Sequence, residues 1–216
     1  MGYLFELKKN KLKEISEKDF SIEKDIQNII ENNVEELFNV KLIKSEFTIN
    51  NYRLDSLCFD EDNKSFVIIE YKKNQSYSVI DQGYSYLSLM LNNKSDFILE
   101  YNENTSSNLK RGSIDWSQSK VIFISPNFTS YQKESINFKD LPIELYEIKR
   151  FNNNTIVLNQ HLSSSNESID LLSNKKGSSI VNSVGKEVKV YSEEEFLSKV
   201  KNPIAVQHYN SLKEGL

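Results

Sequence analysis

Apolar residues recur at helical spacing along one early stretch of the chain. Residues 22–38 carry isoleucine, valine, leucine or phenylalanine every three or four positions, which predicts an amphipathic helix with Ser21 as its N-cap. Just before it, residues 3–8 and 11–16 are strand-like and are separated by a Lys-Asn pair. This arrangement predicts an N-terminal β-hairpin.

Strand-like and helix-like runs follow one another through the middle of the chain. A helix is expected over residues 77–91, and the polar residues 101–113 predict a loop. Alternation of this kind predicts an α/β or α+β fold with a mixed sheet flanked by helices. The expected strands, in chain order, are 41–49, 53–59, 65–72, 96–100, 120–125, 143–149 and 155–158.

Composition divides the chain into three parts. Residues 1–161 hold the expected hairpin, sheet and helices and are assigned to one domain. Residues 162–183 are rich in serine, which is typical of a linker. Residues 184–216 become helical again, with Ser192 as the expected N-cap, and we expect them to begin a helical C-terminal domain that this chain does not complete.

Composition and charge exclude several classes of protein. The 216 residues carry 27 Lys+Arg and 31 Asp+Glu, which gives a net charge of −4. A general affinity for nucleic acid is therefore not expected, although this net charge is compatible with a local basic groove. One cysteine excludes an internal disulfide framework or a Cys-rich zinc site, and His161 and His208 match no metal-ligand spacing. The sequence has neither a long apolar span nor a signal peptide, so we expect a cytoplasmic protein that does not enter a membrane.

Candidate chemistry gathers in two neighbouring strands. If residues 61–64 form the loop of an antiparallel hairpin, Asp55 lies opposite Glu70, and Lys72 lies on the same face. Two carboxylates this close repel each other unless a cation lies between them. Oxygen ligands select a hard ion such as Mg²⁺.

The two flanking helices add further candidates. Gln82 and Tyr86 are four residues apart and share one helix face, and Gly83 between them permits close packing or the approach of a ligand. At about 100° per residue, Glu23 lies within or beside the apolar stripe of the first helix, whereas Glu31 lies farther outside it. Glu23 is therefore the better candidate to join the two carboxylates.

Each of these residues also has an ordinary structural interpretation. Opposed Asp and Glu residues occur on protein surfaces, and Lys72 could form a simple salt bridge with Glu70. Gln82 and Tyr86 could be polar residues on an exposed helix, and Glu23 could be a helix N-terminal charge. The joint arrangement of the hairpin register, the apolar lead-in to Glu70 and the helix that follows favours a functional site.

The arrangement resembles the PD-(D/E)XK nuclease superfamily, which has a restriction-endonuclease-like fold. Asp55 corresponds to the first acid of that motif, although Leu54 stands where the family has proline, and residues 70–72 (Glu-Tyr-Lys) match the (D/E)-x-K element. Residues 82–86 match the Q-x-x-x-Y motif of the RecB-like branch, and Glu23 matches an acid in the first helix. The chain is most similar to a prokaryotic group related to NucS-type endonucleases.

The resemblance implies a metal-dependent nuclease that hydrolyses phosphodiester bonds, with DNA as the expected substrate. The implied Mg²⁺ or Mn²⁺ ligands are Asp55, Glu70, the Tyr71 carbonyl and Glu23, and the other implied catalytic residues are Lys72, Gln82 and Tyr86. The resemblance also allows a homodimer. The alternative is a catalytically silent module with a nuclease-like fold that binds nucleic acid or a partner. Candidate phosphate contacts are Arg53, Lys73, Lys110 and Arg111.

Overall fold

The computed structural model describes residues 3–73, 79–138, 140–167, 184, 188, 193–200 and 202–214. Its centre is a six-stranded mixed sheet with the strand order β3-β4-β5-β6-β7-β8. The first three strands form an antiparallel meander, β5, β6 and β7 run parallel, and β8 returns antiparallel to β7. The strands are β3 Lys41–Ile49, β4 Tyr52–Asp60, β5 Ser65–Tyr71, β6 Lys120–Ser125, β7 Ile143–Arg150 and β8 Ile156–His161.

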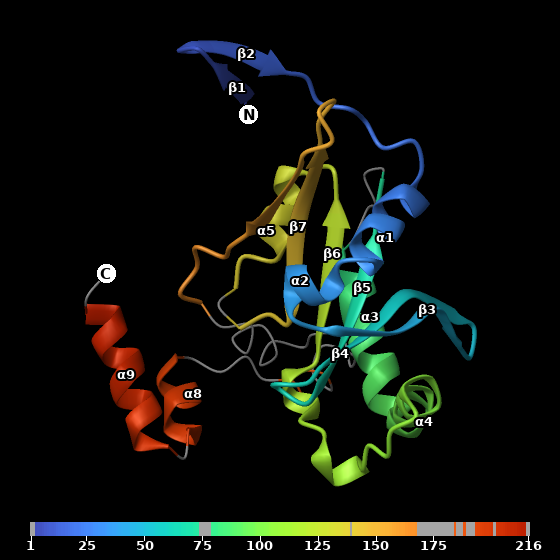
Figure 1. Ribbon diagram of the computed structural model, residues 1–216. Helices are drawn as coiled ribbons and strands as arrows, with labels where there is room; N and C mark the ends of the chain where they lie inside the picture. The colour runs from blue at the N-terminus through green and yellow to red at the C-terminus, as the bar shows by residue number, and fades with distance from the viewer. Residues whose placement is uncertain are drawn as a thin grey trace.

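Helices cover both faces of this sheet (Figure 1). Helices α1 (Glu23–Glu31) and α2 (Val34–Phe38) pack on one face, and α3 (Val79–Asn92) and α4 (Lys94–Thr105) pack on the other. Alternate side chains of β5 serve the two cores, because successive strand residues point to opposite faces. The expected mixed sheet flanked by helices is therefore confirmed. The remaining short helices beside the sheet are η1 Arg111–Ser113, η2 Trp116–Gln118 and α5 Ser130–Ser135.

The expected N-terminal hairpin is present as β1 (Leu4–Lys8) and β2 (Lys11–Ile15), which pair antiparallel. Its turn residues Lys9 and Asn10 have φ angles of 48° and 62°. Two consecutive positive φ angles define the turn that matches the twist of a two-residue hairpin, and asparagine tolerates that conformation well. The hairpin extends away from the sheet at the top of Figure 1.

The first helix differs from the prediction at both ends. The N-cap position is Ile22 and not Ser21, and the carboxylate of Asp25 accepts the backbone N–H groups of both residues. The predicted single helix over 22–38 is two helices, because the side-chain amides of Asn32 and Asn33 donate to the carbonyls four residues earlier. These bonds satisfy carbonyls at a helix end, so the chain turns there.

The predicted strand at 96–100 is wrong. These residues lie inside α4, which also takes the first part of the predicted loop at 101–113. Phe97 and Tyr101 are four residues apart and both are buried, and Phe97 packs edge-on against Phe47 and Phe66 of the sheet. A short apolar run does not distinguish a buried strand from a buried helix face.

Two C-terminal helices, α8 (Glu193–Lys199) and α9 (Pro203–Glu214), lie beside the sheet body (Figure 1). Val184 and Val188 are buried in the core on the α3 side, so part of this segment packs with the main domain. The predicted N-cap Ser192, most of the predicted linker and the first two residues of the predicted helix at 77–91 lie outside the described residues. Among the described residues, no helix is long and apolar enough to span a membrane.

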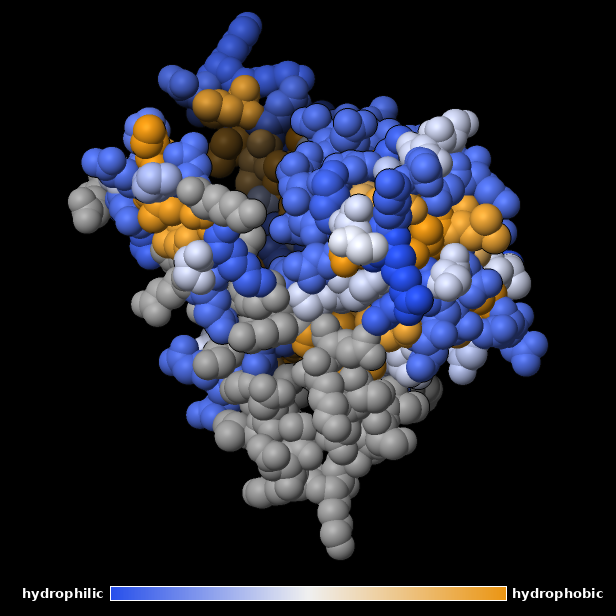
Figure 2. Space-filling view, turned by 90° about the horizontal axis from the view of Figure 1, so that it is seen from below, coloured by the Kyte–Doolittle hydropathy of each residue, from blue (hydrophilic) through white to orange (hydrophobic). Residues whose placement is uncertain are grey.

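The surface seen from below is mostly hydrophilic, with apolar side chains showing between polar ones (Figure 2). The cores lie instead against the sheet, where most β5 side chains are fully buried. The sheet thus provides the rigid support for the polar side chains described next.

Candidate active site

The β4–β5 hairpin has the register predicted from its sequence. Its pairs run from Asp60↔Ser65 to Ser56↔Ile69, and the same register places Asp55 opposite Glu70. Asp60 fixes the loop, since its carboxylate accepts the backbone N–H groups of residues 62 and 63. The hairpin thus brings two acids that are 15 positions apart to one place.

Glu70 lies at the centre of a polar cluster. Its Oε1 accepts from Lys72 Nζ at 2.7 Å and from Gln82 Nε2 at 2.8 Å, and its Oε2 accepts from the Tyr86 hydroxyl at 3.1 Å. Gln82 Nε2 also lies 2.8 Å from the Tyr86 hydroxyl. The glutamate is only 4% exposed, and such a buried carboxylate needs paired donors of this kind.

Helix α3 can deliver Gln82 and Tyr86 because it approaches the sheet closely at Gly83. A Cβ atom at Gly83 would lie 2.5 Å from Ile143 Cδ1 and 3.4 Å from Phe123 Cε2. Only glycine fits there without a shift of the side chains on β6 and β7. Of the two roles considered for Gly83, the structure shows close packing on the sheet.

Asp55 is held beside Glu70 by the backbone. The Tyr71 N–H donates to Asp55 Oδ2 at 2.9 Å. Burial and then the nearby Glu70 carboxylate raise the pKa of Asp55 to about 6, against the lowering effects of the Tyr71 N–H and Lys72. Burial and the Glu70 charge also raise the pKa of Tyr86, which keeps its phenol protonated as a donor.

Glu23 lies near this cluster but at its edge. Its Oε1 accepts the Lys73 N–H at 3.0 Å, and its charge contributes to the raised pKa of Asp55. The side chain is exposed, so it does not turn into the core. The Lys73 ammonium donates to the carbonyl of Ser21 and joins the loop after β5 to the start of α1.

Two residues of α1 that the sequence analysis did not select reach the back of the site. Gln27 Nε2 donates to the Asp55 carbonyl at 3.1 Å and to Glu31 Oε1 at 2.8 Å. Ser56 Oγ donates to Glu31 Oε1 at 2.6 Å and lies 2.9 Å from the Tyr71 hydroxyl. Glu31 is not among the buried residues of α1, in keeping with its expected place outside the apolar stripe, but it is half-buried and accepts from Ser56 of the sheet. The available signal was Gln27, which is polar and one turn after Glu23, beside the buried isoleucines.

The four proposed phosphate contacts do not converge on the cluster: Arg53 makes a long ion pair with Glu46, and Lys110 and Arg111 lie at the other end of β5. Arg53 is 64% exposed at its side chain and lies 3.8 Å from Glu46. Lys110 and Arg111 precede Asp115, whose N–H donates to the carbonyl of Lys64 at the start of β5. That is the opposite end of β5 from Glu70, so the structure does not bring this pair to the site.

The donor set fits a magnesium ion held by two carboxylates. Within the described residues, no group of three or more His, Cys, Asp and Glu side chains is arranged around a common metal position. Mg²⁺ commonly uses one or two protein carboxylates and keeps several waters, so Asp55 and Glu70 suffice. Burial is the main cause of the raised pKa of Asp55, and repulsion from Glu70, which a divalent cation would offset, adds to it.

Comparisons with known proteins give one close relative and three distant structural neighbours. No family model matches the sequence. A Haemophilus influenzae protein described as "Uncharacterized protein" is 47% identical over 214 residues, which cover 99% of this chain and 70% of that protein.

Three solved structures are similar to this chain over part of its length. A repair endonuclease from Pyrococcus abyssi is 18% identical with a TM-score of 0.34, and the match covers 61% of this chain and 49% of that one. Pyrococcus furiosus SfsA in complex with Ca²⁺ is 16% identical with a TM-score of 0.32, over 63% and 61%. An EndoMS–dsDNA complex is 15% identical with a TM-score of 0.31, over 68% and 64%.

The matches cover 49% to 64% of the length of those three solved chains. With TM-scores of 0.34, 0.32 and 0.31, these structural likenesses carry no conclusion about the chemistry of this protein. The sequence similarity to the Haemophilus influenzae protein is much higher, because nearly half of the residues are identical along almost the whole chain. The chain belongs to the same family as that Haemophilus influenzae protein.

Proposed function

We propose that the protein is a metal-dependent nuclease of the PD-(D/E)XK type that hydrolyses phosphodiester bonds in DNA. The observation that carries the proposal is the convergence of Asp55, Glu70 and Lys72 at one end of β5, with Gln82 and Tyr86 on the same carboxylate. Structural salt bridges seldom need a second, repelled carboxylate beside them. Hydrolysis of a phosphodiester needs a cation site and a positioned proton carrier, and this cluster supplies the residues for both.

Asp55 and Glu70, with the Tyr71 carbonyl, would hold Mg²⁺ or Mn²⁺. A bound ion of this kind neutralises phosphate charge and lowers the pKa of a bound water. Lys72 is the residue placed to orient that water and to stabilise charge that develops on the phosphate oxygens, because its Nζ is 2.7 Å from Glu70 and its side chain remains 19% exposed.

Gln82 and Tyr86 act in this proposal as positioning residues. Both donate to Glu70, so they fix its carboxylate rather than touch the substrate. Asp55 is fixed by two hydrogen bonds. Gln27 donates to its backbone carbonyl, and the Tyr71 N–H donates to its carboxylate. Glu23 is exposed beside Lys73 and would reach the metal through water.

The direct test is cleavage of supercoiled plasmid and of labelled single-stranded DNA with Mg²⁺, with Mn²⁺ and with EDTA. Glu70→Gln is the informative variant, because it keeps the size of the side chain and removes the charge. We expect metal-dependent cleavage that the variant loses. Equal cleavage by Glu70→Gln would refute the assignment.

The second candidate is a silent nucleic-acid-binding module with the same fold. The observation that favours it is the full set of donors around Glu70, all supplied by the chain itself. Calorimetric titration with Mg²⁺ separates the two functions. A binding module shows no Mg²⁺ site that depends on Asp55 and Glu70, whereas the nuclease requires one.

A further inference from the structure

A pocket of about 470 Å³ opens beside the candidate active site at the same edge of the sheet. It shares Lys73 with that site, and its other walls come from the chain before α1 and from the ends of β6 and β7. Because β5, β6 and β7 are parallel, their carboxyl ends meet at this edge, and Lys72 donates its N–H to Ile124 of β6. Two strand spacings, about 10 Å, separate β5 from β7.

The pocket keeps an excess of positive charge after the ion pairs made by its lining residues are counted. Glu147 pairs with Lys133 at 2.7 Å, and Glu17 pairs with Lys149 at 2.6 Å. In the part of the chain that the structure describes, no salt bridge involves the other three lining cations, and one further lining carboxylate, that of Asp19, faces them. Those cations are Lys18, Lys73 and Arg150.

Arg150 is held rigidly but only by neutral partners. Its Nη2 donates to the Asp19 carbonyl at 2.6 Å, and its guanidinium carbon lies 4.7 Å from the centre of the Phe20 ring. Its Nε is buried and has no hydrogen-bond partner. A buried donor without a partner is costly, and a guanidinium without a carboxylate partner keeps the positive charge that attracts a phosphate.

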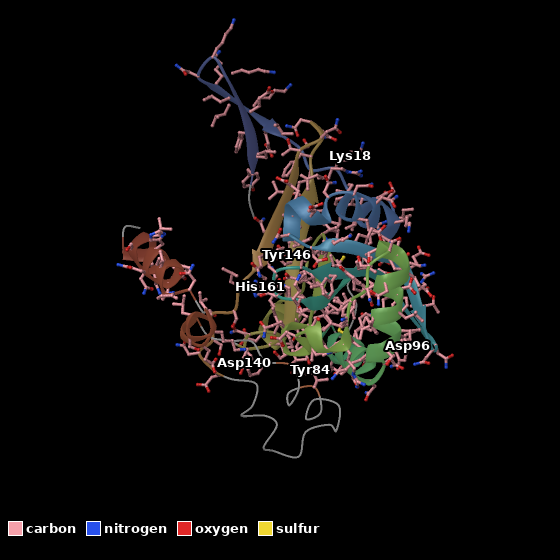
Figure 3. The ribbon with its side chains drawn as sticks, turned by 60° about the horizontal axis from the view of Figure 1, so that its bottom comes forward. Lys18, Tyr84, Asp96, Asp140, Tyr146 and His161 are labelled. Atoms are coloured by element: carbon pink, nitrogen blue, oxygen red, sulfur yellow. The ribbon has the colours of Figure 1, made fainter. Side chains whose placement is uncertain are left out.

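Lys18 provides a second cation that lines the pocket. Its N–H donates to the Arg150 carbonyl at 2.7 Å, which ties the segment before α1 to the end of β7. Its side chain is exposed (Figure 3). Arginine and lysine side chains are among the groups that contact phosphates in nucleic-acid complexes.

We infer that this pocket binds a phosphate group of the nucleic acid, a few nucleotides away from the phosphodiester bond that is cleaved beside Lys72. The inference rests on the proposed nuclease function for its substrate, but its own evidence is Arg150 without a salt bridge, the excess charge and the shared edge. The ligand chemistry is a phosphate, either inside the strand or at its 5′ end. The pocket would set where the strand crosses the sheet edge relative to the metal site.

The test measures binding in EDTA, so that cleavage does not interfere. Fluorescence anisotropy follows a labelled single-stranded oligonucleotide bound to the full chain and to three variants. Lys18→Glu reverses an exposed charge at the pocket, Arg150→Gln removes the guanidinium, and Lys110→Glu makes the same charge change as Lys18→Glu at the opposite end of β5. Circular dichroism verifies that each variant is folded.

We expect Lys18→Glu and Arg150→Gln to weaken binding by about tenfold and to reduce the salt slope by about 1, as for loss of one phosphate contact. Lys110→Glu should stay within about twofold of the unmodified protein. If Arg150→Gln does not fold, Lys18→Glu against Lys110→Glu still decides. Equal binding by the pocket variants and Lys110→Glu would overturn the inference.

A second arm identifies the phosphate. The same oligonucleotide is compared with a 5′-phosphate and with a 5′-hydroxyl, and a preference for the phosphorylated form that Lys18→Glu loses assigns the pocket to a terminal phosphate. Equal binding of both forms, with the Lys18→Glu defect retained, assigns it to a phosphate within the strand. If the unmodified protein does not cleave DNA but binds it in a way that depends on Lys18, the nuclease proposal alone is refuted. Cleavage that is intact without any pocket effect would refute the pocket alone.

Discussion

Two partly or fully buried glutamates lie on opposite faces of the sheet, and they differ in what surrounds them. Glu31 accepts from the neutral donors Gln27 and Ser56 on the α1 face. Glu70 accepts from a lysine and two neutral donors on the α3 face, and a second carboxylate lies beside it. Neutral donors alone are enough to satisfy a carboxylate, and the extra charges around Glu70 are the feature on which the proposed nuclease function rests.

Both networks meet at β5. Glu70 points toward α3, and the next residue, Tyr71, sends its hydroxyl to Ser56 on the α1 side. The Tyr71 N–H meanwhile holds Asp55. One strand therefore joins a supporting network to the proposed reactive one, and substitutions in the two should have different effects.

The largest expected effect is on Lys72. Lys72→Met keeps the length of the side chain and removes the charge, so we expect cleavage to fall by about 10²- to 10³-fold, as for the loss of one transition-state donor. Mg²⁺ binding should persist, because both carboxylates remain. Single-turnover cleavage and calorimetry on the same preparation measure the two effects. Parallel loss of metal and cleavage would assign Lys72 to the fold of the site instead.

The next effect is a pH-dependent gain in stability from Asp55→Asn. The pKa of Asp55 is raised from 3.8 to about 6, so its ionised form destabilises the folded, metal-free protein above pH 6, and this cost disappears as the pH falls toward 4. The shift corresponds to at most about 3 kcal/mol. We expect Asp55→Asn to melt higher than the unmodified protein at pH 8 in EDTA and equally near pH 4.

Adding Mg²⁺ provides the control for that prediction. The ion should raise the melting temperature of the unmodified protein at pH 8 and leave Asp55→Asn unchanged, since binding to the folded state alone stabilises it. Thermal unfolding with and without Mg²⁺ measures both arms. A variant that melts lower than the unmodified protein at pH 8 in EDTA would show that Asp55 is a structural residue.

On the other face, Glu31→Gln should affect stability more than activity. The amide can accept from one donor but places its own N–H₂ near Gln27 or Ser56, and we expect a loss of about 1–2 kcal/mol. Urea unfolding measures the loss. Cleavage should remain within about threefold, and a larger drop in cleavage than in stability would mean that the supporting network takes part in the reaction.

The smallest effect concerns Tyr86. Tyr86→Phe removes one donor to Glu70 while Lys72 and Gln82 remain, so cleavage should fall by about tenfold. A positioning residue should also change the Mg²⁺ dependence, because a less fixed carboxylate binds the ion more weakly. Rates measured across a Mg²⁺ series test this. A uniform loss at every Mg²⁺ concentration would place Tyr86 against the substrate instead.

The β4–β5 register was predictable because a short loop and strict alternation leave little freedom. Asp60↔Ser65 follows from the loop length, and every pair up to Asp55 follows from it. Gln82 and Tyr86 were recognised by helical spacing. What they bind was not predictable, because the distance between α3 and β5 depends on Gly83 fitting against Ile143.

The misses have physical causes of the same kind. Helical periodicity shows which face of α1 is buried. It does not show that Glu31 accepts a hydrogen bond from Ser56, which lies on a strand 25 positions later. Residues 96–100 contain a short apolar run that suits either a strand or a helix, and packing of Phe97 decided it. Lys110 and Arg111 were placed by charge alone, and the chain carries them to the other end of β5.

The central claim is that Glu70 belongs to a reactive site and Glu31 to its support. The most direct measurement is Mg²⁺-dependent cleavage of one DNA substrate by the unmodified protein, Glu70→Gln and Glu31→Gln, assayed side by side below the melting temperature of all three. The account predicts cleavage by the unmodified protein and by Glu31→Gln, and none by Glu70→Gln. Cleavage that survives Glu70→Gln, or that is lost equally in both variants, would contradict it.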